Sequence, residues 1–185
     1  VVLTKEQRSA VETVMESESG LFYLFGVTGS GKTEVFLQCA ERIIAQGGQV
    51  IYLVPEITLT HQLAVQVMER FKNNVAILHS GLTDSQRIAQ WRRIKRSEVS
   101  LVIGARSAVF APCENLRMII IDEEHENSYK SGNDPRYHAR QVAQKRITDC
   151  HGKLLMGSAT PSLEAWHLMK DPSRMTRIDL TARVG

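Results

Sequence analysis

The sequence predicts an α/β domain in which a mostly parallel sheet is covered by helices on both faces. Short runs of aliphatic and β-branched residues alternate with longer amphipathic segments, a pattern typical of strands buried between two helical layers. A glycine-rich turn directly follows the first apolar run, and a pair of acids closes a later one. The alternation predicts the layers, and the two motifs mark the edge of the sheet where a site is expected.

The strands and helices can be placed along the chain from this alternation. Six apolar runs are expected to form strands, at residues 21–25, 50–54, 75–78, 101–103, 118–121 and 154–156. Six segments with helical periodicity lie around them, at residues 4–16, 32–46, 58–71, 84–96, 138–149 and 162–170. Thr83 and Gln86 predict a capping box for the fourth helix, and Trp91 within it is expected to anchor that helix to the core.

Composition excludes several classes of protein. The 185 residues are 43% hydrophobic and 23% charged, which fits one soluble domain. The longest apolar run, residues 21–27, is far shorter than the roughly 18 residues of a membrane helix, so no membrane partner is expected. Cys39, Cys113 and Cys150 are odd in number and widely spaced, which favours a reducing, cytoplasmic compartment over a disulfide framework. The net charge of +3 is too mild to require a nucleic-acid partner.

The strongest motif is a phosphate loop after the first expected strand. It matches GxxxxGK[ST] and opens a helix, as the chemistry requires, over Gly26, Val27, Thr28, Gly29, Ser30, Gly31, Lys32 and Thr33. The glycines let backbone N–H groups turn toward phosphate oxygens, and the helix N-terminus adds positive charge. Lys32 is expected to reach the β- and γ-phosphates of ATP, and Thr33 to offer its hydroxyl to Mg²⁺.

An acidic box closes the fifth expected strand and supplies the second half of the site. Asp122 is the expected partner of Mg²⁺, and Glu123 is placed to orient or deprotonate an attacking water. His125 is assigned a coupling role beside the site, whereas Glu124 and Glu126 fit a solvated acidic turn. A phosphoryl-transfer kinase and a non-catalytic binding module remain alternatives on these residues.

The motifs together resemble the first RecA-like domain of superfamily 2 helicases. The residues 122–125 are a variant of the Asp-Glu-x-His signature, and residues 157–160 resemble the Ser-Ala-Thr motif that links ATP state to nucleic acid through Ser158 and Thr160. By the same resemblance, Gln7 in residues 3–7 is expected to read the adenine edge. Longer stretches resemble the PriA family of replication-restart helicases, at residues 26–36, 53–62, 78–82, 102–110, 121–130 and 135–140.

This resemblance implies contacts with DNA. Arg106 and Ser107 are expected to approach the DNA backbone. Residues 135–140 resemble the family's aromatic-rich loop, which would sense single-stranded DNA and relay it to the ATP site. The expected contacts in that loop come from rings and cations together, namely Arg136, Tyr137, His138 and Arg140.

The resemblance also implies a larger protein. It implies an ATP-dependent 3′→5′ DNA helicase of the bacterial cytoplasm, acting in replication restart and primosome assembly, with primosome and single-strand-binding proteins as partners. Another superfamily 2 translocase, RecG-like or restriction-type, is the alternative. Residues 1–175 are expected to form the ATP-binding domain, and residues 176–185 to begin the connection to a second RecA-like domain with arginine fingers. This chain alone is therefore expected to bind nucleotide but hydrolyse it poorly, and zinc is expected only in a cysteine-rich module outside it.

Overall fold

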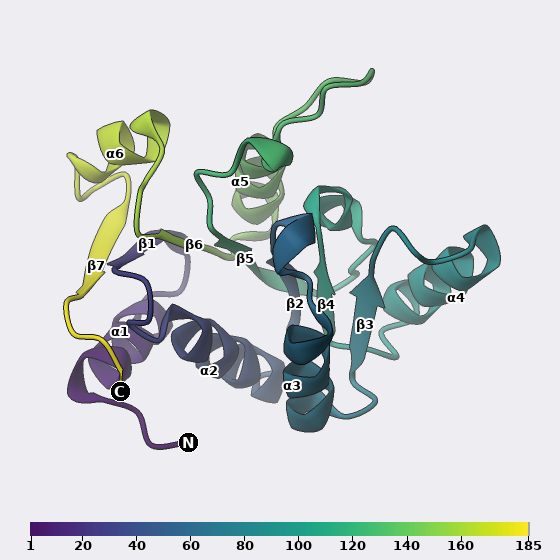
Figure 1. The fold of residues 1–185 in the computed structure, drawn as a ribbon, viewed down its shortest axis with the longest axis horizontal. Helices are drawn as coiled ribbons and strands as arrows, with labels where there is room; N and C mark the ends of the chain where they lie inside the picture. The colour runs from purple at the N-terminus through teal and green to yellow at the C-terminus, as the bar shows by residue number, and fades with distance from the viewer. Residues whose placement is uncertain (185) are drawn as a thin grey trace.

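The structure, a computed structural model, describes residues 1–184 and contains a seven-stranded parallel sheet (Figure 1). The strands are β1 (Gly20–Gly26), β2 (Gln49–Leu53), β3 (Val75–Leu78), β4 (Leu101–Gly104), β5 (Leu116–Asp122), β6 (Lys153–Ser158) and β7 (Thr176–Leu180). Their order across the sheet is β3-β4-β2-β5-β6-β1-β7, with every pair parallel. The six expected strands are confirmed, and so is the α/β class with a RecA-like arrangement.

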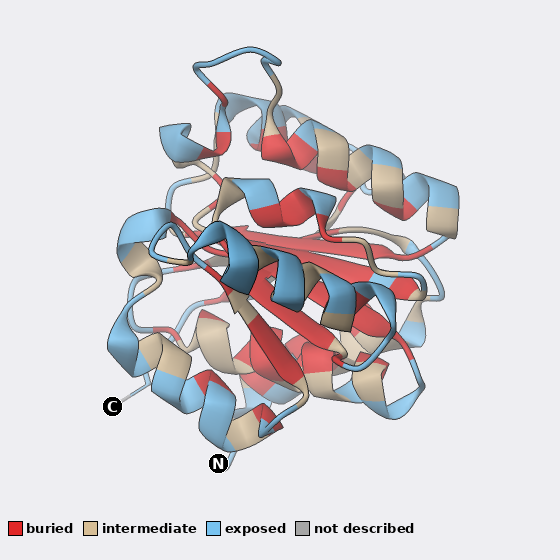
Figure 2. Cartoon of the chain, turned by 90° about the vertical axis from the view of Figure 1, so that its right-hand side faces the viewer, coloured by how far each residue is buried: buried red, intermediate tan, exposed pale blue. Residues whose placement is uncertain are grey.

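Six helices cover the two faces of the sheet (Figures 1 and 2). They are α1 (Lys5–Glu16), α2 (Lys32–Ala45), α3 (His61–Phe71), α4 (Asp84–Lys95), α5 (Ala139–Cys150) and α6 (Leu163–Met169). Three short 3₁₀ helices join them, namely η1 (Glu56–Thr58), η2 (Arg106–Phe110) and η3 (Asn127–Tyr129). One apolar cluster joins the sheet to α1, α2 and α3, and a second joins it to α4, α5 and α6.

Alternation along each strand divides the core between the two layers. In β1, Phe22 and Leu24 belong to the cluster under α1 and α2, whereas Tyr23 points to the opposite cluster. This follows from the two-residue period of a strand, which sends successive side chains to opposite faces. Figure 2 shows the result as a buried sheet between helices whose outer faces are exposed.

The helices begin where their sequences provide caps. Thr83 accepts a hydrogen bond from the backbone N–H of Gln86, and Gln86 Oε1 accepts one from the N–H of Thr83, so the expected capping box is confirmed. Thr4 and Gln7 form a second capping box at the start of α1. Trp91 is half-buried and packs against the second apolar cluster, so its expected role as an anchor of α4 holds in part.

The seventh strand corrects the expected end of the domain. Residues 176–180 were expected to leave the domain, but β7 pairs in parallel with β1 from Thr176 to Leu180. Leu180 is buried in the cluster under α1 and α2. The strand was missed because its burial alternates, with polar Arg177 and Asp179 outward, so it contains no continuous apolar run. The sheet therefore extends to Leu180.

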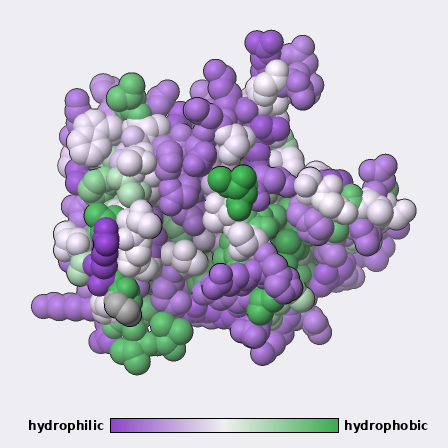
Figure 3. All heavy atoms as spheres, viewed as in Figure 1, coloured by the Kyte–Doolittle hydropathy of each residue, from purple (hydrophilic) through white to green (hydrophobic). Residues whose placement is uncertain are grey.

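The surface is mostly hydrophilic, with scattered apolar side chains (Figure 3). The loop that precedes α5 projects from the body of the domain and consists mostly of hydrophilic residues (Figures 1 and 3). No helix within residues 1–184 is both long enough and apolar enough to cross a bilayer.

Candidate functional site

The phosphate loop connects the end of β1 to the first residue of α2. Gly29 and Gly31 both have φ near 80°, a conformation that glycine adopts without strain. A Cβ on Gly31 would also lie 2.1 Å from Nε2 of Gln7, so a larger residue here would displace the Gln7 amide in addition to straining the backbone. Gly31 is the N-cap of α2 and provides no side-chain cap, which leaves the first N–H groups of the helix available.

Two further features of the loop fit a bound phosphate group. Oγ of Ser30 is buried and has no hydrogen-bond partner among residues 1–184. Nζ of Lys32 donates to the carbonyls of Gly26, at 2.8 Å, and Val27, at 3.2 Å, so the ammonium is held inside the loop. An uncapped helix N-terminus with an enclosed ammonium is a site for an anion.

The acidic box faces this loop across one hollow. A hollow of about 400 Å³ is lined by Gly31 and Thr33 from the phosphate side and by Asp122 from the box. Both segments follow strands that run parallel, β1 and β5, so both emerge at the carboxyl edge with β6 between them. The predicted meeting of the phosphate loop and the acids is thus present in the structure.

Asp122 is the acid best placed to hold a cation. Its side chain is buried, and burial together with the neighbouring Glu123 raises the pKa of Asp122 from 3.8 to about 6. A divalent cation at this carboxylate would remove that penalty. No group of three or more His, Cys, Asp or Glu within residues 1–184 could hold a metal by itself. One carboxylate and the Thr33 hydroxyl instead fit Mg²⁺, which takes few protein ligands alongside phosphates and water.

Two tyrosines that sequence reasoning missed support Asp122. The hydroxyl of Tyr52, in β2, donates to Oδ2 of Asp122 at 3.3 Å. The hydroxyl of Tyr129, in η3, donates to the backbone carbonyl of Asp122 at 2.5 Å and to that of Leu53 at 3.3 Å. A tyrosine within an apolar strand needs a buried partner for its hydroxyl, and this was the available signal for Tyr52.

Glu123 follows Asp122 in an unusual backbone conformation. Its φ is 49°, in the left-handed region that non-glycine residues rarely adopt. The N–H of Glu123 donates to Oδ1 of Asp122 at 2.9 Å, and its carbonyl accepts from the N–H of Glu126 at 3.0 Å. Strain of this kind persists where surrounding contacts impose it, and it is concentrated at functional sites.

His125 joins the acidic box to the Ser-Ala-Thr motif. Its Nδ1 is hydrogen-bonded to Oγ of Ser158 at 2.5 Å, and the same Oγ accepts from the N–H of Thr160 at 2.9 Å. His125 also lies 3.5 Å from a carboxylate oxygen of Glu123. The structure therefore brings together all four residues that the sequence assigned to coupling or water activation at this point.

Glu124 is a correction to the sequence analysis. It was expected in a solvated turn, but it is only 1% exposed. Its carboxylate accepts hydrogen bonds from Tyr23 and Ser162 and pairs with Arg140. An acid is buried at this depth only when donors surround it, and those donors come from segments far away in the sequence.

Gln7 joins the start of α1 to the phosphate loop. Its Oε1 accepts from the N–H of Thr4 at 2.9 Å, and its Nε2 donates to the carbonyl of Gly31 at 3.2 Å. The residue is buried, and each end of its amide has one further hydrogen-bonding position. Its expected contact with adenine stays a prediction.

The residues expected at the DNA backbone divide into inward and outward positions. Nη1 of Arg106 donates to the carbonyls of Ser128 and Lys130, at 3.0 and 3.1 Å, and so secures the segment after the acidic box. The Arg106 guanidinium also lies 5.8 Å from the ring centroid of Tyr137. Ser107 is exposed. Of the two, only Ser107 presents its side chain outward.

The residues of the aromatic-rich loop also include both exposed and buried side chains. Arg136 is exposed, and Tyr137 is half-buried with its ring edge-on to Phe110 at 4.9 Å between centroids. His138 instead caps α5, because its Nδ1 accepts from the N–H of Arg140, and burial lowers its pKa. Arg140 is buried on Glu124. His138 and Arg140 thus make contacts within the protein, and their expected DNA contacts stay predictions; Phe110 is an exposed aromatic that the sequence analysis missed.

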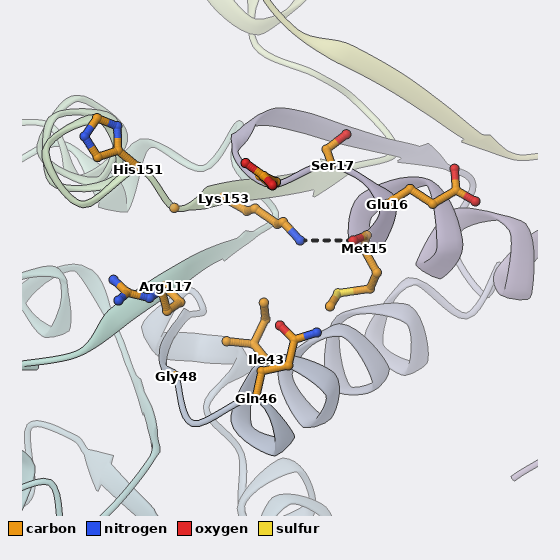
Figure 4. Close-up of a pocket in the computed structure, with 11 residues that line it drawn as sticks. Met15, Glu16, Ser17, Ile43, Gln46, Gly48, Arg117, His151 and Lys153 are labelled. Carbon is orange, nitrogen blue, oxygen red and sulfur yellow. Dashed lines mark hydrogen bonds between the residues drawn. The ribbon is translucent and has the colours of Figure 1, made fainter.

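A second hollow, of about 340 Å³, lies at the opposite edge of the sheet (Figure 4). Nζ of Lys153, at the start of β6, points into it and donates to the carbonyl of Met15 at 3.4 Å (Figure 4). This hollow is lined by the ends of α1 and α2, so it receives carbonyl groups and offers no helix N-terminus. Its lining includes the basic side chains of Arg117, His151 and Lys153, but it lacks the backbone N–H groups of a helix start.

Comparison with known proteins agrees with this geometry. Residues 4–167 match the DEAD/DEAH box helicase family. The chain belongs to this family. It is 54% identical over 184 residues to "Replication restart protein PriA" of Treponema pallidum (strain Nichols), covering 99% of this chain and 28% of that relative. It is 53% identical over 168 residues to the protein of the same name from Bacillus subtilis (strain 168), covering 89% of this chain and 21% of the relative.

These relatives confirm the resemblance to PriA proteins within the DEAD/DEAH box helicases. A solved structure of RecG bound to a three-way DNA junction superposes with a TM-score of 0.69 at 22% identity, covering 100% of this chain and 24% of that chain. This likeness confirms the fold of a helicase domain. The chain spans about a quarter of the length of the PriA relatives described above.

Proposed function

We propose that this domain binds a magnesium nucleoside triphosphate, ATP by resemblance, at the carboxyl edge of its sheet. The observation that carries the proposal is the shared hollow, where Gly31 and Thr33 at an uncapped helix N-terminus face a buried Asp122. The ammonium of Lys32 is held in the same loop. A cationic wall suits the phosphates, and an acid opposite it suits a metal bound to them. The magnesium would neutralise phosphate charge when bound.

The residues of the chain divide the work between them. Lys32, which donates to the carbonyls of Gly26 and Val27, would donate to phosphate oxygens instead, and Thr33 and Asp122 would hold the cation. Tyr52 keeps the Asp122 carboxylate oriented through its hydrogen bond. Glu123 accepts a proton from the attacking water, and its fixed backbone turn holds its carboxylate near His125.

We also propose that the longer protein couples this site to movement along DNA, as a 3′→5′ helicase in replication restart. Support comes from the PriA name of its relatives and from RecG, a protein of the same fold solved on a DNA junction. Within this chain, exposed Ser107 and Arg136, together with Tyr137 and Phe110, offer a phosphate-binding and stacking surface.

The proposal extends to the rest of the protein. A second RecA-like domain would close over the nucleotide and supply arginine fingers, which are worth roughly 10³–10⁵ in turnover. This chain alone should therefore bind magnesium nucleotide weakly and hydrolyse it barely. Primosome proteins, single-strand-binding proteins, a zinc module and a place in the bacterial cytoplasm belong to the same proposal. A RecG-like or restriction-type motor is less well supported, because RecG shares 22% identity and PriA relatives share up to 54%.

The decisive experiment uses the longer protein that contains this domain. Glu123→Gln should retain magnesium-dependent nucleotide binding but lose hydrolysis and strand displacement on forked DNA, by about 10²-fold or more for a general base. Glu114→Gln, at an exposed acid outside the box, is the control and should keep both activities. Hydrolysis by Glu123→Gln at the unsubstituted rate would contradict the assigned role.

A further inference from the structure

One acid of the box has no part in the proposed nucleotide chemistry. Glu124 directly follows Glu123, yet its side chain is completely enclosed on the face of the sheet that carries α5 and α6. Its backbone N–H donates to the carbonyl of Gly157, at 3.1 Å, which fixes the acidic box to the end of β6. Burying a carboxylate costs free energy, so an acid at this position is expected to have a role outside the proposed chemistry.

The Glu124 carboxylate is satisfied by four donors. Oε1 accepts from the hydroxyl of Tyr23 at 2.9 Å and from the N–H of Ser162 at 2.8 Å. Oε2 accepts from the hydroxyl of Ser162 at 2.8 Å and from Nη1 of Arg140 at 3.2 Å. Only an ionised carboxylate accepts at all of these positions, because a glutamine would present N–H groups to two of the donors.

The donors come from three segments that matter to the site. Tyr23 lies in β1, the strand that leads into the phosphate loop. Ser162 is the N-cap of α6 and follows the Ser-Ala-Thr motif. Arg140 lies in the first turn of α5, directly after the exposed part of the aromatic-rich loop. Figure 1 shows α5 and α6 on the same side of the sheet, so one carboxylate fastens both helix starts to the acidic box.

This arrangement makes the segments move together. Arg140 also donates to the hydroxyl of Ser162 at 3.3 Å, which closes the network on itself. A displacement of the acidic box would leave buried donors unpaired unless α5 and α6 followed it. Water would compete for hydrogen bonds between these segments if they were exposed, whereas the Glu124 carboxylate is enclosed.

We infer that Glu124 is a positioning residue that transmits the state of the nucleotide site to the aromatic-rich loop. The inference rests on the proposed function, and it deepens it by naming the connection between the two ligands. Nucleotide at the acidic box and single-stranded DNA at the loop then change each other's affinity through the network of Glu124, Arg140, Ser162 and Tyr23.

The test measures that reciprocal effect in the longer protein that contains this domain. The dissociation constant of a fluorescein-labelled oligothymidylate is measured by anisotropy, with and without magnesium and a non-hydrolysable ATP analogue. The unsubstituted protein should show a ratio of about fivefold or more between the two constants. Glu124→Gln should bring the ratio close to one, while nucleotide affinity without DNA changes by no more than about twofold. Glu114→Gln, at an exposed acid outside this network, is the control and should keep the ratio.

Two further variants separate coupling from a general loss of structure. Glu124→Gln combined with Arg140→Gln replaces the ion pair by two amides and should recover part of the ratio. Tyr23→Phe removes one donor and no volume, so it should lower the ratio even if Glu124→Gln does not fold. An unchanged ratio in Tyr23→Phe, or in a folded Glu124→Gln, overturns this inference alone. No nucleotide effect on DNA affinity in the unsubstituted protein overturns the proposed coupling as well.

Discussion

The two edges of the sheet each have a hollow and a buried lysine, but only the carboxyl edge combines them with the N-terminus of a helix. At the carboxyl edge, Lys32 bonds to loop carbonyls beside the start of α2. At the amino edge, Lys153 bonds to the carbonyl of Met15 in the last turn of α1 (Figure 4). The hollows differ little in size, about 400 and 340 Å³, so volume does not distinguish them.

Helix direction explains the difference. A helix carries partial positive charge at its N-terminus and negative charge at its C-terminus. Lys153 lies near helix C-termini, whose partial negative charge favours a cation, although burial lowers its pKa. Lys32 lies at the N-terminus of α2, whose partial positive charge favours a bound anion. Parallel strands with helical crossovers place every helix start at the carboxyl edge, so the fold itself selects this edge for phosphate.

The largest expected effect comes from exchanging each lysine for methionine in turn. Lys32→Met removes charge-assisted hydrogen bonds to phosphate, each worth about 1.5–3 kcal/mol, so nucleotide affinity should fall by about 100-fold. Lys153→Met makes the same chemical change at the other edge and should leave affinity within about twofold. Fluorescent ADP titrations with magnesium measure both. Equal losses in the two variants would show that the lysines act through stability alone.

A smaller effect, on the free energy of unfolding, is expected from Asp122, and this effect depends on pH. The folded pKa of Asp122, about 6, lies above its ordinary value of 3.8, so ionisation at neutral pH opposes folding. Without ligand, the free energy of unfolding should therefore rise as pH falls from 7 toward 4. Asp122→Asn should gain about 1–2 kcal/mol at pH 8 and nothing at pH 4, by denaturant titration.

Magnesium nucleotide should reverse this pH trend. Protonated Asp122 cannot hold a cation, so affinity for magnesium nucleotide should fall as pH drops below about 6. Stability without ligand and affinity with ligand thus change in opposite directions over the same range. If nucleotide binding by Asp122→Asn still depended on magnesium, Asp122 would not hold the cation. The carboxyl edge would then differ from the amino edge only in its phosphate loop.

The sequence predicted the carboxyl edge well because its motifs are local. The phosphate loop is contiguous, and the acidic box ends one strand, so the parallel-sheet rule alone brings Lys32 and Asp122 to the same edge. The pattern of apolar runs likewise predicted six strands. The strand order could not be predicted from these local motifs. β7 was missed because this half-exposed edge strand, with Arg177 and Asp179 outward, contains no continuous apolar run.

What the sequence could not predict depends on distant partners. In the sequence, Glu124 is one of several neighbouring acids, which predicts an exposed side chain. Its burial is explained only by the contacts that Tyr23, Ser162 and Arg140 make with it in the folded domain. For Arg140 the sequence predicts a DNA contact, because its charge is visible in the sequence, whereas its buried partner Glu124 is not. Buried polar networks join residues far apart in the chain, so local patterns carry little information about them.

The smallest expected effect compares two residues with the same backbone strain. Glu123, at the carboxyl edge, has φ of 49°, and His151, which ends α5 at the amino edge, has φ of 53°. Glycine adopts this conformation freely, so either residue changed to glycine should gain about 0.5–1 kcal/mol in the free energy of unfolding. Denaturant titration of His151→Gly and Glu123→Gly measures the gain.

Function should separate the two glycine variants. His151→Gly follows the usual composition of a helix C-terminus and should leave ATP hydrolysis by the longer protein unchanged. Glu123→Gly should abolish hydrolysis while the domain becomes more stable, because the strained residue carries the carboxylate that the chemistry requires. A loss of stability in Glu123→Gly would mean that the contacts of Glu123 with its neighbours outweigh the strain. The left-handed acid would then be a consequence of packing, and the two edges would be alike in this respect.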